Sequence, residues 1–224
     1  MTKNAEARRV AGLYAITPDT EDTPMLLAKV EAALRGGTRW LQYRSKRTDV
    51  DARVRQARAL RQLCTRHGAR LIVNDDADLA LAVDADGVHL GAADGSIAET
   101  RRRLGPDRVI GASCYDRLDL AERAVGEGAD YVAFGSVFAS AVKPGAVRAP
   151  LTLLSRARGQ LDVPIVAIGG VSADNAGAAI AAGAHAVAVI SAVFDAPDVE
   201  AAARSIVQLF ASRSEVDETR QKTG

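Results

Sequence analysis

Residues 173–191 read Ala-Asp-Asn-Ala-Gly-Ala-Ala-Ile-Ala-Ala-Gly-Ala-His-Ala-Val-Ala-Val-Ile-Ser. Alanine dominates the first half of this stretch, and the β-branched residues cluster only after Gly183. A helix that stops at a glycine and leads into a short buried strand produces this pattern. The chain carries no formal charge between Asp174 and Asp195 and so imitates a membrane span, but glycines and polar residues interrupt the run. We therefore predict a helix and a strand here, not a span.

The same alternation of a short β-branched run and an amphipathic Ala/Leu/Arg-rich stretch recurs along the chain. Gly-Ala-Asp at 128–130 opens a strand as Gly-Ala-His at 183–185 does. The predicted strands cover residues 13–17, 40–44, 71–74, 87–90, 109–113, 131–135, 164–168 and 186–190. The predicted helices cover residues 25–35, 50–67, 77–82, 97–104, 118–126, 151–158, 173–182 and 199–210.

Eight such units favour an α/β fold, a single (β/α)8 TIM barrel, over an open doubly wound sheet. No Pro/Ser-rich linker divides the chain. We expect the barrel to cover residues 10–211, between a flexible N-terminus at 1–9 and a polar C-terminal tail at 212–224. In such a barrel the active site is expected where the strands end and the following loops begin.

The composition argues against a protein that binds through its whole surface and favours one that binds its partners at a single local site. The chain of 224 residues balances 29 basic against 28 acidic side chains and has only 4% aromatics, which argues against nucleic-acid binding. Two distant cysteines suggest neither a disulfide framework nor a zinc site, and a reducing cytoplasm is the simplest compartment. The first residues lack the apolar core of a secretory signal. We expect a cytoplasmic protein with small-molecule partners and no membrane partner; the sequence leaves a homo-oligomer open.

The second predicted strand ends in a row of polar residues. Period-two alternation places Gln42, Arg44 and Lys46 on one face, at the barrel mouth. Such a row suits a diphosphate, because Arg grips oxygens bidentately and Lys adds a point charge. A solvated loop is the alternative, and for Lys46 alone the two interpretations are evenly balanced.

The third and fourth predicted strands each deliver a carboxylate to the same rim. Asp75 and Asp94 could share Mg²⁺, which takes one or two carboxylates and completes its shell with phosphate and water. A helix N-cap is the alternative role for an aspartate here, and we assign it to Asp76.

The remaining strand ends point to a second anion site. Ser113 ends the fifth predicted strand, and the loop 135–145 after the sixth is either a substrate lid carrying Lys143 or a long crossover. Gly169-Gly170 and Ile190-Ser191 follow the seventh and eighth, where barrels commonly bind phosphate. We interpret His89, inside a strand, as a structural residue rather than a catalytic one.

These features together resemble the thiamine-phosphate synthase family from Leu13 to about Phe210. The phrases that carry the resemblance are Leu-Gln-Tyr-Arg-Ser-Lys (41–46), Val-Asn-Asp-Asp-Ala-Asp-Leu-Ala-Leu-Ala (73–82), Gly-Val-His-Leu-Gly (87–91), Gly-Ala-Asp-Tyr-Val-Ala-Phe-Gly-Ser-Val-Phe (128–138), Ala-Ile-Gly-Gly-Val (167–171) and Val-Ile-Ser-Ala (189–192).

The resemblance implies a Mg²⁺-dependent transferase that joins hydroxymethylpyrimidine diphosphate to a carboxylated thiazole phosphate, releasing pyrophosphate and CO2. It implies Asp75 and Asp94 as metal ligands. The residues implied to bind the pyrimidine diphosphate are Gln42, Tyr43, Arg44, Ser45, Lys46, Asn74, Ser113 and Lys143, of which Arg44, Lys46, Ser113 and Lys143 would be catalytic. The residues implied to bind the thiazole phosphate are Ser140, Ala141, Val142, Gly169, Gly170, Ile190 and Ser191.

The chain departs from the family pattern at two places. The family usually has Pro-Thr-x-Thr-Lys where this chain has Ala-Ser-Ala-Val-Lys at 139–143, and Ala92 replaces an expected Gln. Val142 donates no side-chain hydrogen bond, which predicts weaker thiazole-phosphate affinity. One alternative is a thiazole tautomerase of the same barrel family, which would not need Gln42, Arg44 and Lys46 together with Asp75 and Asp94. The other is a non-catalytic phosphate-binding barrel, which only the substitution at Val142 favours.

Overall fold

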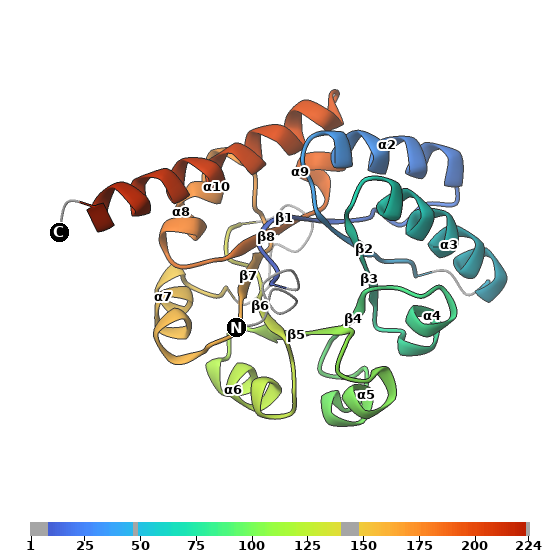
Figure 1. Ribbon diagram of the computed structural model, residues 1–224, viewed down its shortest axis with the longest axis horizontal. Coiled ribbons are helices and arrows are strands. Elements are labelled where there is room, and N and C mark those ends of the chain that lie inside the picture. The colour runs from blue at the N-terminus through green and yellow to red at the C-terminus, as the bar shows by residue number, and fades with distance from the viewer. Residues whose placement is uncertain (1–8, 47–48, 140–147, 223–224) are drawn as a thin grey trace.

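The computed structural model describes residues 9–46, 49–139 and 148–222, with side chains described as far as Ala211. Its parallel strands form a closed barrel in sequence order, and β8 pairs with β1 to complete the ring (Figure 1). This confirms the predicted (β/α)8 TIM barrel. The strands are β1 (Gly12–Ile16), β2 (Trp40–Tyr43), β3 (Arg70–Asn74), β4 (Gly87–Leu90), β5 (Val109–Tyr115), β6 (Tyr131–Phe134), β7 (Ile165–Ile168) and β8 (Ala186–Val189).

Helices cover the outside of the barrel (Figure 1). Several begin at an aspartate or serine whose side chain accepts a backbone N–H of the first turn, as Asp22, Asp49 and Ser96 do. Asp76 caps in the same way, as predicted. The helices are α2 (Thr23–Arg35), α3 (Val50–Arg66), α4 (Ala77–Ala82), α5 (Ile97–Leu104), α6 (Leu118–Gly126), α7 (Leu151–Gln160), α8 (Ala173–Ala181), α9 (Ser191–Phe194) and α10 (Val199–Lys222).

The last two helices differ from the sequence prediction. The four-residue α9 lies directly after β8 and is too short to show a helical period. The final helix was predicted to end at residue 210, but α10 continues to Lys222 and extends beyond the barrel (Figure 1). The polar segment from 212 onward contains no Gly or Pro before Gly224, so nothing in it breaks the helix.

Alternating strand residues divide the core into two layers. One face of each strand packs against the surrounding helices, as Leu41 and Val73 do. The other face fills the barrel interior, where Tyr14, Trp40 and Tyr131 are the largest side chains of a separate buried cluster. This alternation fixes which side chain at each strand end can reach the barrel mouth.

At the amino-terminal end of the barrel, side-chain hydrogen bonds link neighbouring strands and helices. Asp86 accepts hydrogen bonds from the Leu71 amide at 2.8 Å, from Arg61 at 2.6 Å and from Arg70 at 3.0 Å. His185 Nδ1 accepts the Ile165 amide at 2.9 Å, which ties β8 to β7.

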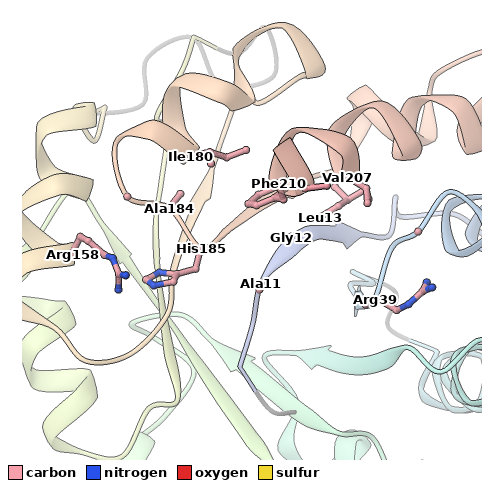
Figure 2. A pocket seen from close by; sticks show the side chains of 13 residues that line it. Ala11, Gly12, Leu13, Arg39, Arg158, Ile180, Ala184, His185, Val207 and Phe210 are labelled. Atoms are coloured by element: carbon pink, nitrogen blue, oxygen red, sulfur yellow. The ribbon is translucent and has the colours of Figure 1, made fainter. Parts of the chain in front are cut away.

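A cavity of about 540 Å³ opens at this same end (Figure 2). Arg158 and His185 line it on one side, and Val207 and Phe210 of α10 lie over its apolar part. It contains none of the predicted site residues, because those lie at the opposite, carboxyl ends of the strands. Among the described residues, no helix combines the length and apolar character needed to cross a bilayer.

Candidate active site

The polar row after β2 is held by the loop after β1. The buried Thr17 hydroxyl accepts the Arg44 amide at 2.9 Å and donates to the Arg44 carbonyl at 3.2 Å. The Asp19 carboxylate accepts the Lys46 amide at 3.3 Å and the Ser45 hydroxyl at 3.5 Å. These contacts fix the backbone from which Arg44 and Lys46 project. Arg44 lies close enough to Asp75 for its positive charge to oppose the rise in the pKa of that carboxyl.

Neighbouring residues of β2 point to opposite sides. Gln42 faces the barrel interior, where it is 3% exposed and its Nε2 donates to the Tyr14 hydroxyl at 3.1 Å. Tyr43 instead lies in the layer between barrel and helices, and its hydroxyl donates to Gln56 of α3 at 2.9 Å. The expectation that Tyr43 binds the diphosphate is therefore wrong for its side chain, since strand alternation sends that side chain away from the mouth.

Asp75 and Asp94 come together at the mouth. Their carboxyl groups are close enough to share a hydrogen bond. Asn74 Nδ2 donates to Asp75, and the Gly91 amide donates to Asp94 at 2.8 Å. A side chain at Gly91 would meet the Asp94 carboxylate at 2.7 Å, so glycine permits this approach.

The backbone at Asp75 is unusual. Its φ of 62° lies in the left-handed region, which non-glycine residues seldom adopt, although Asp tolerates it better than most. The Asp75 amide donates to the His89 carbonyl at 2.8 Å, which holds this turn against β4. The strained turn directs the carboxylate toward Asp94.

Partial burial of its carboxylate, with the hydrogen bond and charge of Asp94, raises the pKa of Asp75 to about 6. Two carboxylates this close repel each other unless a proton or a cation lies between them. Mg²⁺ fits this donor set, because one or two carboxylates suffice when substrate phosphates supply other ligands. Among the described residues no group of three or more His, Cys, Asp or Glu side chains is placed to hold a metal.

The metal-free protein should reveal this repulsion through pH. A raised folded-state pKa means that the folded protein binds the Asp75 proton more tightly than the unfolded chain does. Stability is therefore unaffected below about pH 3.8, the usual value, and falls as the pH rises to about 6. Solvent screening of this exposed residue keeps the effect small. In EDTA, Asp75→Asn should melt above the unsubstituted protein at pH 7.5 and beside it at pH 4; a pH-independent difference would contradict the argument.

Ser113 of β5 and His89 of β4 lie on neighbouring strands and contact each other inside the mouth. Ser113 is half-buried near the end of β5, with its Oγ 2.9 Å from His89 Nε2. The other ring nitrogen, Nδ1, lies 2.9 Å from the Tyr131 hydroxyl. Burial lowers the pKa of His89 to about 4, so the ring is neutral at pH 7. Both ring nitrogens are occupied, which agrees with the structural role predicted for His89.

The glycine pair after β7 packs against the loop after β6. A Cβ on Gly169 would lie 2.7 Å from Ser136, and one on Gly170 would lie 2.4 Å from the Ala139 carbonyl oxygen. The Phe138 amide also donates to the Gly169 carbonyl at 2.9 Å. The glycines therefore allow two loops of the mouth to touch, in addition to leaving a backbone surface for a ligand.

Ile190 and Ser191 begin the short helix α9, and both are exposed. A short extra helix after the last strands accompanies the usual phosphate site of this fold. Ser140, Ala141, Val142 and Lys143 lie outside the described residues, so their expected roles stay predictions.

The sequence interpretation missed the residues that support this mouth. Thr17 and Asp19 hold the loop after β2, and Tyr14 and Tyr131 lie inside the barrel beneath Gln42 and Ser113. The position of Tyr14 was predictable from the sequence, because strand alternation directs its side chain into the barrel interior as it does that of Gln42.

The closed parallel barrel, with cations, carboxylates and glycine loops at the carboxyl ends of its strands, places the protein among the (β/α)8-barrel enzymes. The sequence model of the thiamine monophosphate synthase family matches residues 13–193. The chain belongs to that family, and its relatives identify it as a transferase of thiamine biosynthesis.

Individual relatives are similar over nearly their whole length. A thiamine-phosphate synthase from Thioalkalivibrio sulfidiphilus is 57% identical over 94% of this chain and 99% of that protein. Another from Chromobacterium violaceum is 57% identical over 92% of this chain and 99% of its own length. The solved thiamine phosphate pyrophosphorylase from Pyrococcus furiosus superposes with a TM-score of 0.81 at 35% identity, covering 93% of this chain and 98% of that one.

Proposed function

We propose that the protein is a Mg²⁺-dependent thiamine-phosphate synthase that joins hydroxymethylpyrimidine diphosphate to a carboxylated thiazole phosphate. The observation that supports the Mg²⁺ requirement is the approach of the Asp75 and Asp94 carboxyl groups at the barrel mouth, a pair that a bound cation would stabilise. Arg44 lies beside this pair and adds a positive charge for the diphosphate.

The bond changes require charge neutralisation and no covalent nucleophile. The bond between the pyrimidinylmethyl carbon and the diphosphate oxygen breaks, and its electrons leave with the diphosphate. The lone pair of the thiazole nitrogen then forms the new C–N bond, and loss of CO2 returns the carboxylate bonding electrons to the ring. Mg²⁺ held by Asp75 and Asp94 would offset the charge that develops on the leaving oxygen.

The chain's own residues bind and align the two substrates. Thr17 and Asp19 hold the backbone amides of Arg44 and Lys46, so the two cationic side chains extend toward the diphosphate from a fixed loop. Gln42 and Ser113 face the pyrimidine ring, and the loops at Gly170 and Ser191 receive the thiazole phosphate. Holding both substrates in line supplies the rest of the acceleration by proximity.

The reaction belongs in the cytoplasm. Cys64 and Cys114 are both buried free thiols, as a reducing compartment allows. Burial raises the pKa of each thiol to about 12, so neither supplies a thiolate nucleophile.

A coupling assay tests the proposal directly. The purified protein with both substrates and Mg²⁺ should form thiamine phosphate, pyrophosphate and CO2, and EDTA should stop the reaction until excess Mg²⁺ is restored. Tautomerisation of the thiazole carboxylate without coupling would replace the proposal with the tautomerase. Phosphate binding without either reaction would establish the non-catalytic barrel.

A further inference from the structure

A continuous chain of hydrogen bonds crosses the barrel interior from β2 to β5. Gln42 Nε2 donates to the Tyr14 hydroxyl at 3.1 Å, and that hydroxyl lies 2.8 Å from the hydroxyl of Tyr131. The Tyr131 hydroxyl lies 2.9 Å from His89 Nδ1, and His89 Nε2 lies 2.9 Å from Ser113 Oγ. We call these five side chains the core chain. Its two ends, Gln42 and Ser113, are the side chains that the proposed function places against the pyrimidine.

The middle of the core chain is sealed from water. Tyr14 is 1% exposed and Tyr131 is 0% exposed. The two rings meet edge to face at 5.9 Å, and the ring of Tyr131 stacks on that of His89 at 5.5 Å. A buried hydroxyl left without a partner costs about 1–3 kcal/mol. Each of these hydroxyl protons therefore has to be accepted within the core chain.

This requirement gives the core chain a direction. The Tyr14 oxygen accepts from Gln42, so the Tyr14 proton goes to Tyr131. The Tyr131 proton then goes to His89 Nδ1, which must be an unprotonated acceptor. The one proton of the neutral imidazole is thus on Nε2 and is donated to Ser113 Oγ. The Ser113 hydroxyl proton remains available to a ligand.

The direction decides what the two ends present. With its amide nitrogen turned inward, Gln42 presents its carbonyl oxygen, an acceptor, while Ser113 presents a donor. If the amide turned over, every bond of the core chain would have to reverse, and Gln42 would present a donor and Ser113 an acceptor. An arrangement in which only some of these hydrogen bonds reverse leaves a buried tyrosine hydroxyl without an acceptor. The hydrogen-bonding roles of Gln42 and Ser113 therefore change together.

We propose that Tyr14, Tyr131 and His89 are positioning residues that make the mouth selective for an aminopyrimidine over an oxopyrimidine. This rests on the proposed function for the identity of the substrate. A 4-aminopyrimidine offers an N–H donor beside a ring nitrogen that accepts, which matches an acceptor at Gln42 and a donor at Ser113. The 4-oxo analogue offers a carbonyl and a ring N–H, which is the opposite pattern. A site built for one hydrogen-bond pattern rejects the other strongly.

The tautomer of His89 tests the direction without any substrate. Long-range ¹H–¹⁵N NMR distinguishes a proton on Nε2 from one on Nδ1, and the other two histidines can be assigned with His67→Gln and His185→Gln. The full-length protein should show the Nε2–H tautomer for His89. Tyr14→Phe should keep this tautomer, because Tyr131 still donates to Nδ1. A predominant Nδ1–H tautomer in the unsubstituted protein would overturn the proposal.

Substrate discrimination tests the consequence. The unsubstituted enzyme should use the 4-amino diphosphate at least about 100-fold better in kcat/KM than its 4-oxo analogue. In Tyr131→Phe the nearest remaining acceptor for the Tyr14 proton is the Gln42 carbonyl, so the amide turns over. The preference should then narrow by about tenfold or more, mainly through a higher KM for the amino substrate.

A merely structural role for Tyr131 would lower activity on both substrates equally and leave their ratio unchanged, which would refute the proposal. If Tyr131→Phe does not fold, Tyr14→Phe provides the second test, since it releases the Gln42 amide alone and should narrow the ratio without changing the His89 tautomer. A protein with the Nε2–H tautomer but no synthase activity would refute the proposed function and leave the core chain intact. An active enzyme with the Nδ1–H tautomer would support the proposed function and refute the direction of the core chain.

Discussion

Replacing Asp94 by alanine should lower kcat/KM for the coupling reaction by roughly 10²- to 10³-fold, the scale of losing one preorganised electrostatic contact to a developing charge. Asp75 would remain as a single carboxylate for Mg²⁺, and the apparent Mg²⁺ affinity should fall with the rate. Steady-state kinetics over a Mg²⁺ titration measures both effects.

The folded protein should tolerate this change. Asp94→Ala removes a hydrogen bond from the Gly91 amide but also removes the negative charge beside Asp75, so the free energy of unfolding should change by about 1 kcal/mol or less. Asp78→Ala is the matched control, because Asp78 lines the same surface hollow and its side chain is 81% exposed. Equal losses of activity in both variants would argue against a metal-binding role for Asp94.

Gly111→Ala should destabilise the protein by about 3 kcal/mol or more, the upper range for overpacking a core. A Cβ at this position would lie 2.0 Å from the Cζ atom of Tyr131, whose ring is completely buried. The ring cannot move without breaking its hydrogen bonds to Tyr14 and His89. Urea denaturation followed by circular dichroism measures the loss, which is a large share of an ordinary domain stability.

Gly177→Ala provides the comparison for this prediction. Gly177 lies in the middle of α8, where an added Cβ meets nothing within 4 Å. This variant should be about as stable as the unsubstituted protein or up to about 1 kcal/mol more stable, because alanine favours a helix. If Gly111→Ala matched it, the barrel interior would have to be more adaptable than its packing indicates.

The barrel was predictable from sequence because each strand and helix carries its own pattern. The run at 173–191 shows this most clearly, since its alanine half became α8 and its β-branched half became β8. The predictions failed where local pattern does not determine the outcome. The short α9 has no period to read, and the continuation of α10 depends on the absence of a breaker in a polar segment.

The sequence was sufficient to predict which strand ends form the site. It was not sufficient to predict the residues that hold those strand ends in place. Asp75 and Asp94 could be paired from sequence because adjacent parallel strands deliver their ends to one rim. The prediction for Tyr43 came from its position within the Leu-Gln-Tyr-Arg-Ser-Lys phrase. Strand alternation instead directs its side chain outward, toward Gln56 of α3. The Tyr14–Tyr131 contact joins residues 117 positions apart, and no local pattern records such a distance.

The left-handed backbone at Asp75 restricts how this position can vary. Glycine and asparagine suit that conformation as well as aspartate or better, whereas β-branched and bulky residues do not. Of the three residues that suit the turn, only aspartate brings a negative charge. Asparagine or glycine at position 75 would therefore keep the turn and remove the charge that the proposed metal site requires.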